Sequence, residues 1–125
     1  MHPAILIFLG GGLGSVCRYA LSHGATRVLG DTLPFGTLAV NLLGAFAIGF
    51  LADLLALKLS LPPAWRYALM TGFLGGFTTF SAFSFESALL WQRGDYAALG
   101  VYIVLSVVGT IALVLLGAAV ARQLA

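Results

Sequence analysis

Four long apolar runs dominate the chain, and three short, more polar segments separate them. The runs cover residues 3–22, 34–57, 66–91 and 96–121. A helix needs roughly 20 apolar residues to cross a bilayer, and each run reaches that length. Inside lipid, a helix satisfies its own backbone hydrogen bonds, whereas irregular backbone does not. The pattern therefore predicts an all-α integral membrane protein with four transmembrane helices in a single domain.

The third run has residues at its centre that disfavour a continuous helix. They are Gly72, Gly75, Gly76, Thr78 and Thr79. Each glycine costs about 1 kcal/mol in a helix relative to alanine, and threonine hydroxyls compete for backbone hydrogen bonds. An unbroken helix over residues 66–91 would be roughly 39 Å long, which exceeds a hydrocarbon core of about 30 Å. We therefore expect this helix to break near mid-membrane, at residues 75–79.

Polar side chains lie inside the second and fourth runs. Asn41 is surrounded by apolar neighbours, and a buried amide in lipid must find hydrogen-bond partners. Its spacing fits a contact between helices and a polar pathway equally well, although Thr37, one turn earlier on the same face, favours the pathway. Tyr102, Ser106 and Thr110 share one helix face. These hydroxyls either form a polar track or bond their own helix backbone, and the sequence leaves both interpretations open.

Aromatic and charged residues in the first and third runs are further candidates. A row at helical spacing contains Phe73, Phe77, Phe80 and Phe83, with Ser81 and Ser84 beside it. Spacing alone favours core packing for this row. Glu86 is the one carboxylate clearly inside a run, so it is either a functional residue or a group that reaches a vestibule near Trp91. Arg18 lies late in the first run, where we expect it to extend to the membrane surface.

Composition narrows the class of protein further. The 125 residues are 61% hydrophobic and only 8% charged, whereas an ordinary soluble domain is about 25% charged. A net charge of +2 is too small for a nucleic-acid-binding surface. The single cysteine, Cys17, excludes an internal disulfide, and neither a nucleophile–base pair nor a metal cluster is evident. We therefore expect a protein that is not an enzyme and has no nucleic-acid partner.

Small residues and charges predict how the helices associate. Gly10 and Gly14 form a GxxxG spacing, which allows close helix packing. The basic residues divide three against three between the two sides of the membrane, with Arg18, Arg27 and Arg93 facing Lys58, Arg66 and Arg122. This balance gives no preferred orientation under the positive-inside rule. Such a chain can insert both ways, and two opposite copies can pair as an antiparallel, dual-topology homodimer.

Three sequence motifs resemble those of a known family. They are GGxLGSxxRY ending at Tyr19, FGTLxVNLLGAFxxGF over residues 35–50 and TGFLGGFTTFSAFSFE over residues 71–86. With the order of the four runs, they resemble the Fluc (CrcB) family of small bacterial and archaeal fluoride channels over nearly the whole chain. The resemblance implies a fluoride-selective channel that exports fluoride passively across the inner membrane of a prokaryotic cell. It also implies a dual-topology dimer in lipid, with two pores and a structural sodium ion at its centre.

The resemblance also implies roles for individual residues. Backbone carbonyls of Gly75 and Thr78 are expected to hold the sodium ion, two from each chain. Arg18 matches a family arginine, and the expected pore residues are Asn41, Phe80, Phe83, Ser81, Ser84, Tyr102, Ser106 and Thr110. Hydroxyl and amide groups can donate hydrogen bonds to fluoride, and an aromatic edge carries positive partial charge. Under this interpretation the aromatic row lines a pore.

Two other classes of function compete with the channel. A small multidrug-type proton-coupled transporter needs a membrane carboxylate, normally in the first helix. The first run has no acidic residue, so Glu86 would have to serve instead. A purely structural helix-packing subunit would leave Asn41 and the hydroxyl rows without a role beyond helix contacts.

Overall fold

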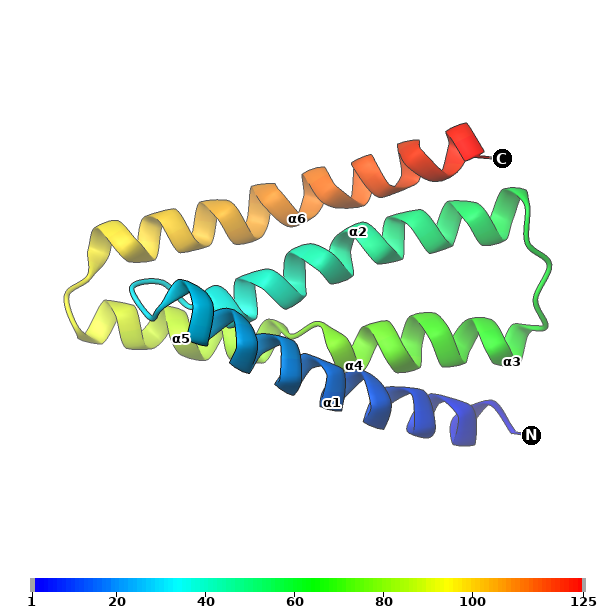
Figure 1. The fold of residues 1–125 in the computed structure, drawn as a ribbon, viewed down its shortest axis with the longest axis horizontal. Helices are drawn as coiled ribbons and strands as arrows, with labels where there is room; N and C mark the ends of the chain where they lie inside the picture. Colours follow the sequence, from blue (N-terminus) through cyan, green and yellow to red (C-terminus); the bar gives the residue numbers. More distant parts are fainter. Residues whose placement is uncertain (1, 125) are drawn as a thin grey trace.

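The computed structural model describes residues 2–124, which form four long helical segments (Figure 1). In chain order the elements are α1 (Pro3–Leu29), α2 (Phe35–Leu57), α3 (Pro63–Arg66), the π-helix η1 (Tyr67–Leu74), α4 (Gly75–Phe77), α5 (Phe80–Gln92) and α6 (Tyr96–Leu124). The third segment combines the elements from α3 to α5. All four segments are long and apolar enough to cross a membrane. The predicted all-α fold with four spanning helices is therefore confirmed.

Two packed helix pairs make up the bundle. α2 lies alongside α6, and α1 crosses the third segment beside η1 and α4. Figure 1 shows both termini and the α2–α3 connection at one end, and the other two connections at the opposite end. At the first end Arg122 pairs with Asp53 at 2.6 Å, and Lys58 donates to the backbone oxygen of Leu124 at 3.0 Å. These contacts hold the last turn of α6 against the end of α2.

The helices extend beyond the limits that the apolar pattern predicts. α1 continues through residues 23–29, because a solvent-exposed helix tolerates polar residues and this stretch contains no proline. It ends at Gly30, whose positive φ of 87° suits glycine. The expected polar linker is therefore helical in its first part. The third segment begins earlier than expected, with Pro63 in its first turn, and α6 reaches Leu124.

The third segment breaks as predicted, but the break is narrower than residues 75–79. Only Thr78 and Thr79 leave the helical conformation. Thr78 has a ψ of 159°, and Thr79 has a φ of −152° and a ψ of 118°, so both are extended. Gly75 and Gly76 stay helical in α4, because α1 packs against this turn and stabilises it. The sequence pattern does not predict η1, in which the Gly75 amide donates to the backbone oxygen of Met70.

Glycines allow α1 and the third segment to approach closely. Cβ atoms at Gly10 and Gly14 would collide with the backbone of η1. On the opposite side of the same contact, Cβ atoms at Gly72 and Gly76 would collide with the backbone of α1. The packing role predicted for the GxxxG pair is confirmed.

Replacing Gly14 with alanine is expected to destabilise the protein by about 1–3 kcal/mol, which is the usual cost of overpacking a tight contact. The added methyl group would overlap the backbone of η1, which cannot rotate away as a side chain can. Gly12→Ala is the matched control, since a Cβ there would meet none of the described atoms within 4 Å apart from its own neighbours in α1. Thermal unfolding in detergent compares the two variants. Equal stability would contradict the packing argument.

Candidate functional site

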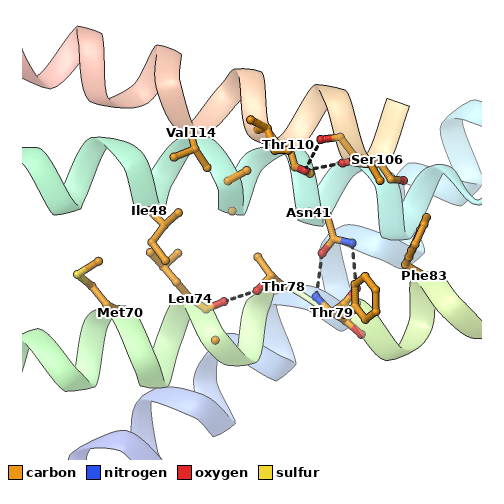
Figure 2. Close-up of a pocket in the computed structure, with 16 residues that line it drawn as sticks. Asn41, Ile48, Met70, Leu74, Thr78, Thr79, Phe83, Ser106, Thr110 and Val114 are labelled. Atoms are coloured by element: carbon orange, nitrogen blue, oxygen red, sulfur yellow. Dashed lines mark hydrogen bonds between the residues drawn. The ribbon is translucent and has the colours of Figure 1, made fainter. Parts of the chain in front are cut away.

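The helix break leaves backbone groups unsatisfied inside the bundle, and Asn41 pairs with two of them. Its Nδ2 donates to the backbone oxygen of Thr79 at 2.9 Å, and its Oδ1 accepts from the Thr79 amide at 2.8 Å (Figure 2). The side-chain amide thus takes the place of a peptide group. Such pairing matters in lipid, where each unsatisfied backbone group costs several kcal/mol. Asn41 therefore makes a contact between helices, which was one of its two open interpretations.

Hydroxyl groups stabilise the start of α5 after the break. Thr79 Oγ1 accepts the amide of Ala82 at 3.0 Å as the N-cap, and it lies 3.2 Å from Ser81 Oγ. Ser84 donates to the backbone oxygen of Phe80 at 3.0 Å. The contacts of Ser81 and Ser84 are thus local to the first turns of α5.

Carbonyl groups before the break find partners in their own turn and in α1. The Leu74 oxygen accepts from the amide of Thr78 at 3.0 Å and from its hydroxyl at 2.9 Å (Figure 2). The Gly76 oxygen accepts from Arg18 Nε at 3.1 Å and from Ser15 Oγ at 3.5 Å. The expectation that Arg18 extends to the membrane surface is therefore wrong. The longer α1 places Arg18 near the middle of the helix, beside the break.

Two other backbone oxygens at the break lose their helical donors. In a continuous helix, the oxygen of Gly75 would accept the amide of Thr79, and that of Thr78 would accept the amide of Ala82. Both amides donate instead to side-chain oxygens, those of Asn41 and Thr79. Carbonyl oxygens are ligands that hard cations take. Two carbonyls do not complete a coordination shell, so a cation here needs ligands from elsewhere.

A cavity of about 430 Å³ lies beside the break, with walls from α2, the third segment and α6 (Figure 2). The expected site residues in its lining are Asn41, Gly75, Thr78, Phe80, Phe83, Ser106 and Thr110. The other expected residues, Ser81, Ser84, Tyr102, Arg18 and Glu86, lie outside this lining. Much of the remaining wall is aliphatic, including Ile48, Met70 and Val114. The fold therefore gathers a few polar groups, distant in sequence, in one apolar cavity.

Three aromatic rings form a continuous series next to this cavity. The Phe80 and Phe83 ring centroids are 5.5 Å apart with 43° between their planes. Those of Phe83 and Tyr102 are 5.2 Å apart at 46°. In such a tilted arrangement, the ring edges, which carry positive partial charge, point towards neighbouring groups. Phe73 and Phe77 stack on each other at 6.1 Å, away from the cavity lining, so the aromatic row divides at the break.

The three hydroxyls of α6 have different surroundings. Thr110 donates to the backbone oxygens of Ser106 and Val107, as the backbone-bonding interpretation expected. Tyr102 Oη and Ser106 Oγ are buried and have no hydrogen-bond partner among the residues that the structure describes. Leaving such a group unsatisfied costs about 1–3 kcal/mol. We therefore expect water or a ligand to pair with these two hydroxyls.

A second cavity, of about 450 Å³, is more polar and borders the break from the side of α1. Its lining includes Ser15, Arg18, Ser22, Thr26, Thr37 and Glu86. Glu86 accepts a hydrogen bond from the Thr37 hydroxyl. Thr79 lines both cavities, so the break lies between them. Residues 15, 22 and 26 share one helix face. This row was not predicted because Thr26 fell in the expected linker, and Ser15 and Ser22 alone do not reveal it.

The fold and the site define a small multi-pass membrane protein with a broken third helix, which has a largely apolar cavity on one side and a more polar cavity on the other. Comparison with protein families then identifies the family of the chain. It belongs to the CrcB-like protein family, Camphor Resistance (CrcB), whose model matches residues 5–118. The family expected from the sequence motifs is therefore confirmed.

Relatives of similar length share one description. The chain is 50% identical over 125 residues to the fluoride-specific ion channel FluC of Rhizobium johnstonii, covering 100% of both chains. It is 44% identical over 124 residues to the protein of the same name from Citrifermentans bemidjiense, covering 99% of this chain and 100% of the relative. It is 42% identical over 120 residues to the fluoride-specific ion channel FluC 2 of Nitrobacter hamburgensis, covering 96% and 97%. The chain is thus a multi-pass membrane protein of prokaryotic type.

Proposed function

We propose that this chain is a fluoride-selective ion channel that lets fluoride leave the cell passively and so lowers its cytoplasmic concentration. The observation that carries the proposal is its full-length similarity, at 42–50% identity, to bacterial proteins named fluoride-specific ion channels. Passive movement needs no catalytic group and no coupled chemical reaction. The protein is accordingly a channel and not an enzyme.

The groups beside the break suit a small, strongly hydrated anion, because a pore must replace its lost water with hydrogen-bond donors. Asn41 Nδ2 carries two hydrogens, and its bond to the break uses one of them. The buried hydroxyls of Tyr102 and Ser106 lack protein partners among the described residues. The ring edges of Phe80 and Phe83 add weak positive potential. In this proposal fluoride moves along these groups.

A small multidrug-type transporter remains the alternative, and it would need Glu86 to exchange protons. The Glu86 carboxylate accepts a hydrogen bond from Thr37. The names of the relatives describe channels. Proton flux that depends on a cationic drug is therefore not expected from this protein.

We further propose that the working unit is an antiparallel homodimer with two pores and a central sodium ion. Phe80 lines the cavity yet keeps 78% of its surface exposed, so one chain leaves the cavity wall incomplete. The carbonyls of Gly75 and Thr78 would hold the ion, two from each copy, and the bound ion would supply a fixed positive charge. Because Arg18 lies at the break, it no longer counts towards either membrane surface. The numbers of basic residues at the two ends then differ by only one, which still permits dual insertion.

Labelling at the C-terminus tests the antiparallel arrangement. In a Cys17→Ser background, Leu124→Cys is expected to react with a membrane-impermeant reagent about half from each side of the membrane, because a twofold pair presents both orientations equally. Labelling from one side alone would rule out the antiparallel dimer.

Fluoride release from liposomes tests the proposed channel. Liposomes that contain the purified protein and potassium fluoride are expected to release fluoride rapidly after a potassium ionophore is added, as measured by a fluoride electrode. Potassium chloride liposomes are the control and are expected to stay silent. No release from protein shown to be folded and inserted would refute the proposal.

A further inference from the structure

A positive charge lies inside the bundle, outside the groups proposed to contact fluoride. Arg18 is half-buried near the middle of α1, and its Nε donates to the Gly76 oxygen at 3.1 Å. A charged side chain in the middle of a membrane helix costs at least about 2.5–3.5 kcal/mol. The hydrogen bond to Gly76 offsets part of this cost. A polar residue at the end of the helix would avoid the cost altogether, so the position of Arg18 near the middle needs a structural reason.

The two glycines of α4 have different surroundings. A Cβ at Gly76 would collide with the backbone of Gly11 in α1, whereas a Cβ at Gly75 would have only the Met70 oxygen nearby, at 3.8 Å. Gly75 lines the 430 Å³ cavity, and Gly76 does not. The α4 turn is therefore held on the side of α1 and open on the side of the cavity.

The end of this helical stretch also collects negative partial charge. A helix C-terminus leaves carbonyl groups without amide donors and carries the equivalent of about half a negative charge. The guanidinium of Arg18 keeps its charge and donates in a fixed geometry. It therefore offsets the negative partial charge of the Gly76 carbonyl, which faces α1. The carbonyls of Gly75 and Thr78, by contrast, have lost the amide donors that a continuous helix would give them.

We propose that Arg18 is a positioning residue for the break. By binding the Gly76 oxygen, it holds α4 in the orientation in which Gly75 and Thr78 line the cavity. Ser15, at 3.5 Å from the same oxygen, is a weaker second contact. The expected consequence for fluoride flux rests on the proposed channel function, whereas the effect on the break does not depend on it.

Hydrogen–deuterium exchange of the full-length protein in lipid nanodiscs tests the proposal. Losing a hydrogen bond to a charged group is expected to raise amide exchange over residues 75–83 at least about tenfold in Arg18→Gln. Arg18→Lys keeps the charge without the planar guanidinium and is expected to give an intermediate increase. Arg27→Gln, in the exposed last turn of the same helix, is the matched control and is expected to match the wild type.

Unchanged exchange over residues 75–83 in Arg18→Gln would overturn the proposal. Exchange raised equally along all helices would also overturn it, because that pattern indicates general loosening. If Arg18→Gln does not fold, Arg18→Lys and Ser15→Ala carry the same comparison, with the smaller increase expected for Ser15→Ala.

Fluoride release is the second readout for the same variants. Flux is expected to fall about tenfold in Arg18→Gln, in proportion to the loosened break, and to recover partly in Arg18→Lys. Normal flux with a loosened break would contradict the link between the break and the pore. Silent wild-type protein would instead refute the channel function, and the exchange comparison would still decide the role of Arg18.

Discussion

Replacing Asn41 with aspartate is expected to lower fluoride flux by about 100-fold. The carboxylate can still accept the Thr79 amide, but it no longer donates to the Thr79 oxygen. It also places a negative charge beside the proposed path of an anion. Two such charges about 6 Å apart repel by roughly 2.8 kcal/mol at an effective dielectric constant of about 20, which corresponds to about 100-fold. Fluoride release from liposomes measures the effect.

A second substitution at the same position separates charge from hydrogen bonding. Asn41→Ala removes both bonds to the break without adding charge, and it leaves two backbone groups unsatisfied at about 1–3 kcal/mol each. It is expected to lower thermal stability and to reduce flux less than aspartate does. Leu43→Met is the matched control on the same helix, because Leu43 is 54% exposed and does not line the cavity. Wild-type flux in folded Asn41→Asp protein would place the pore elsewhere.

Replacing Phe83 with isoleucine is expected to lower fluoride flux about tenfold. Phe83 is the middle ring of the series, between Phe80 and Tyr102. Isoleucine keeps most of the apolar volume but has no ring edge to face an anion. An aromatic contact is worth about 0.5–1.5 kcal/mol beyond its buried area, and the upper value corresponds to about tenfold.

The matched control for this variant lies on the same helix. Phe85 is 66% exposed and does not line the cavity, so Phe85→Ile is expected to leave fluoride flux unchanged. Thermal unfolding of both variants checks that each is folded. Equal flux in Phe83→Ile and Phe85→Ile would remove the aromatic series from the proposed pathway.

Much of the architecture follows from the sequence alone. The four spans are readable because crossing a bilayer requires about 20 consecutive apolar residues, which is a local property of the chain. Local composition also indicates a break in the third helix, since glycines weaken it and threonines offer alternative hydrogen bonds. The motif around the break indicates the family, and the family model confirms it. The sodium ion and the antiparallel dimer stay predictions.

Only the tertiary structure decides where the break falls and which groups satisfy it. Gly75 and Gly76 remain helical because α1 packs against their turn at Gly76, so the break moves to the two threonines. Asn41 pairs with Thr79, and Arg18 binds Gly76, across separations of 38 and 58 residues. Sequence spacing describes neighbours on one helix, but it does not describe which faces of distant helices meet. The pairing of buried polar groups depends on these contacts between helices, because in lipid each group must find its partner within the protein.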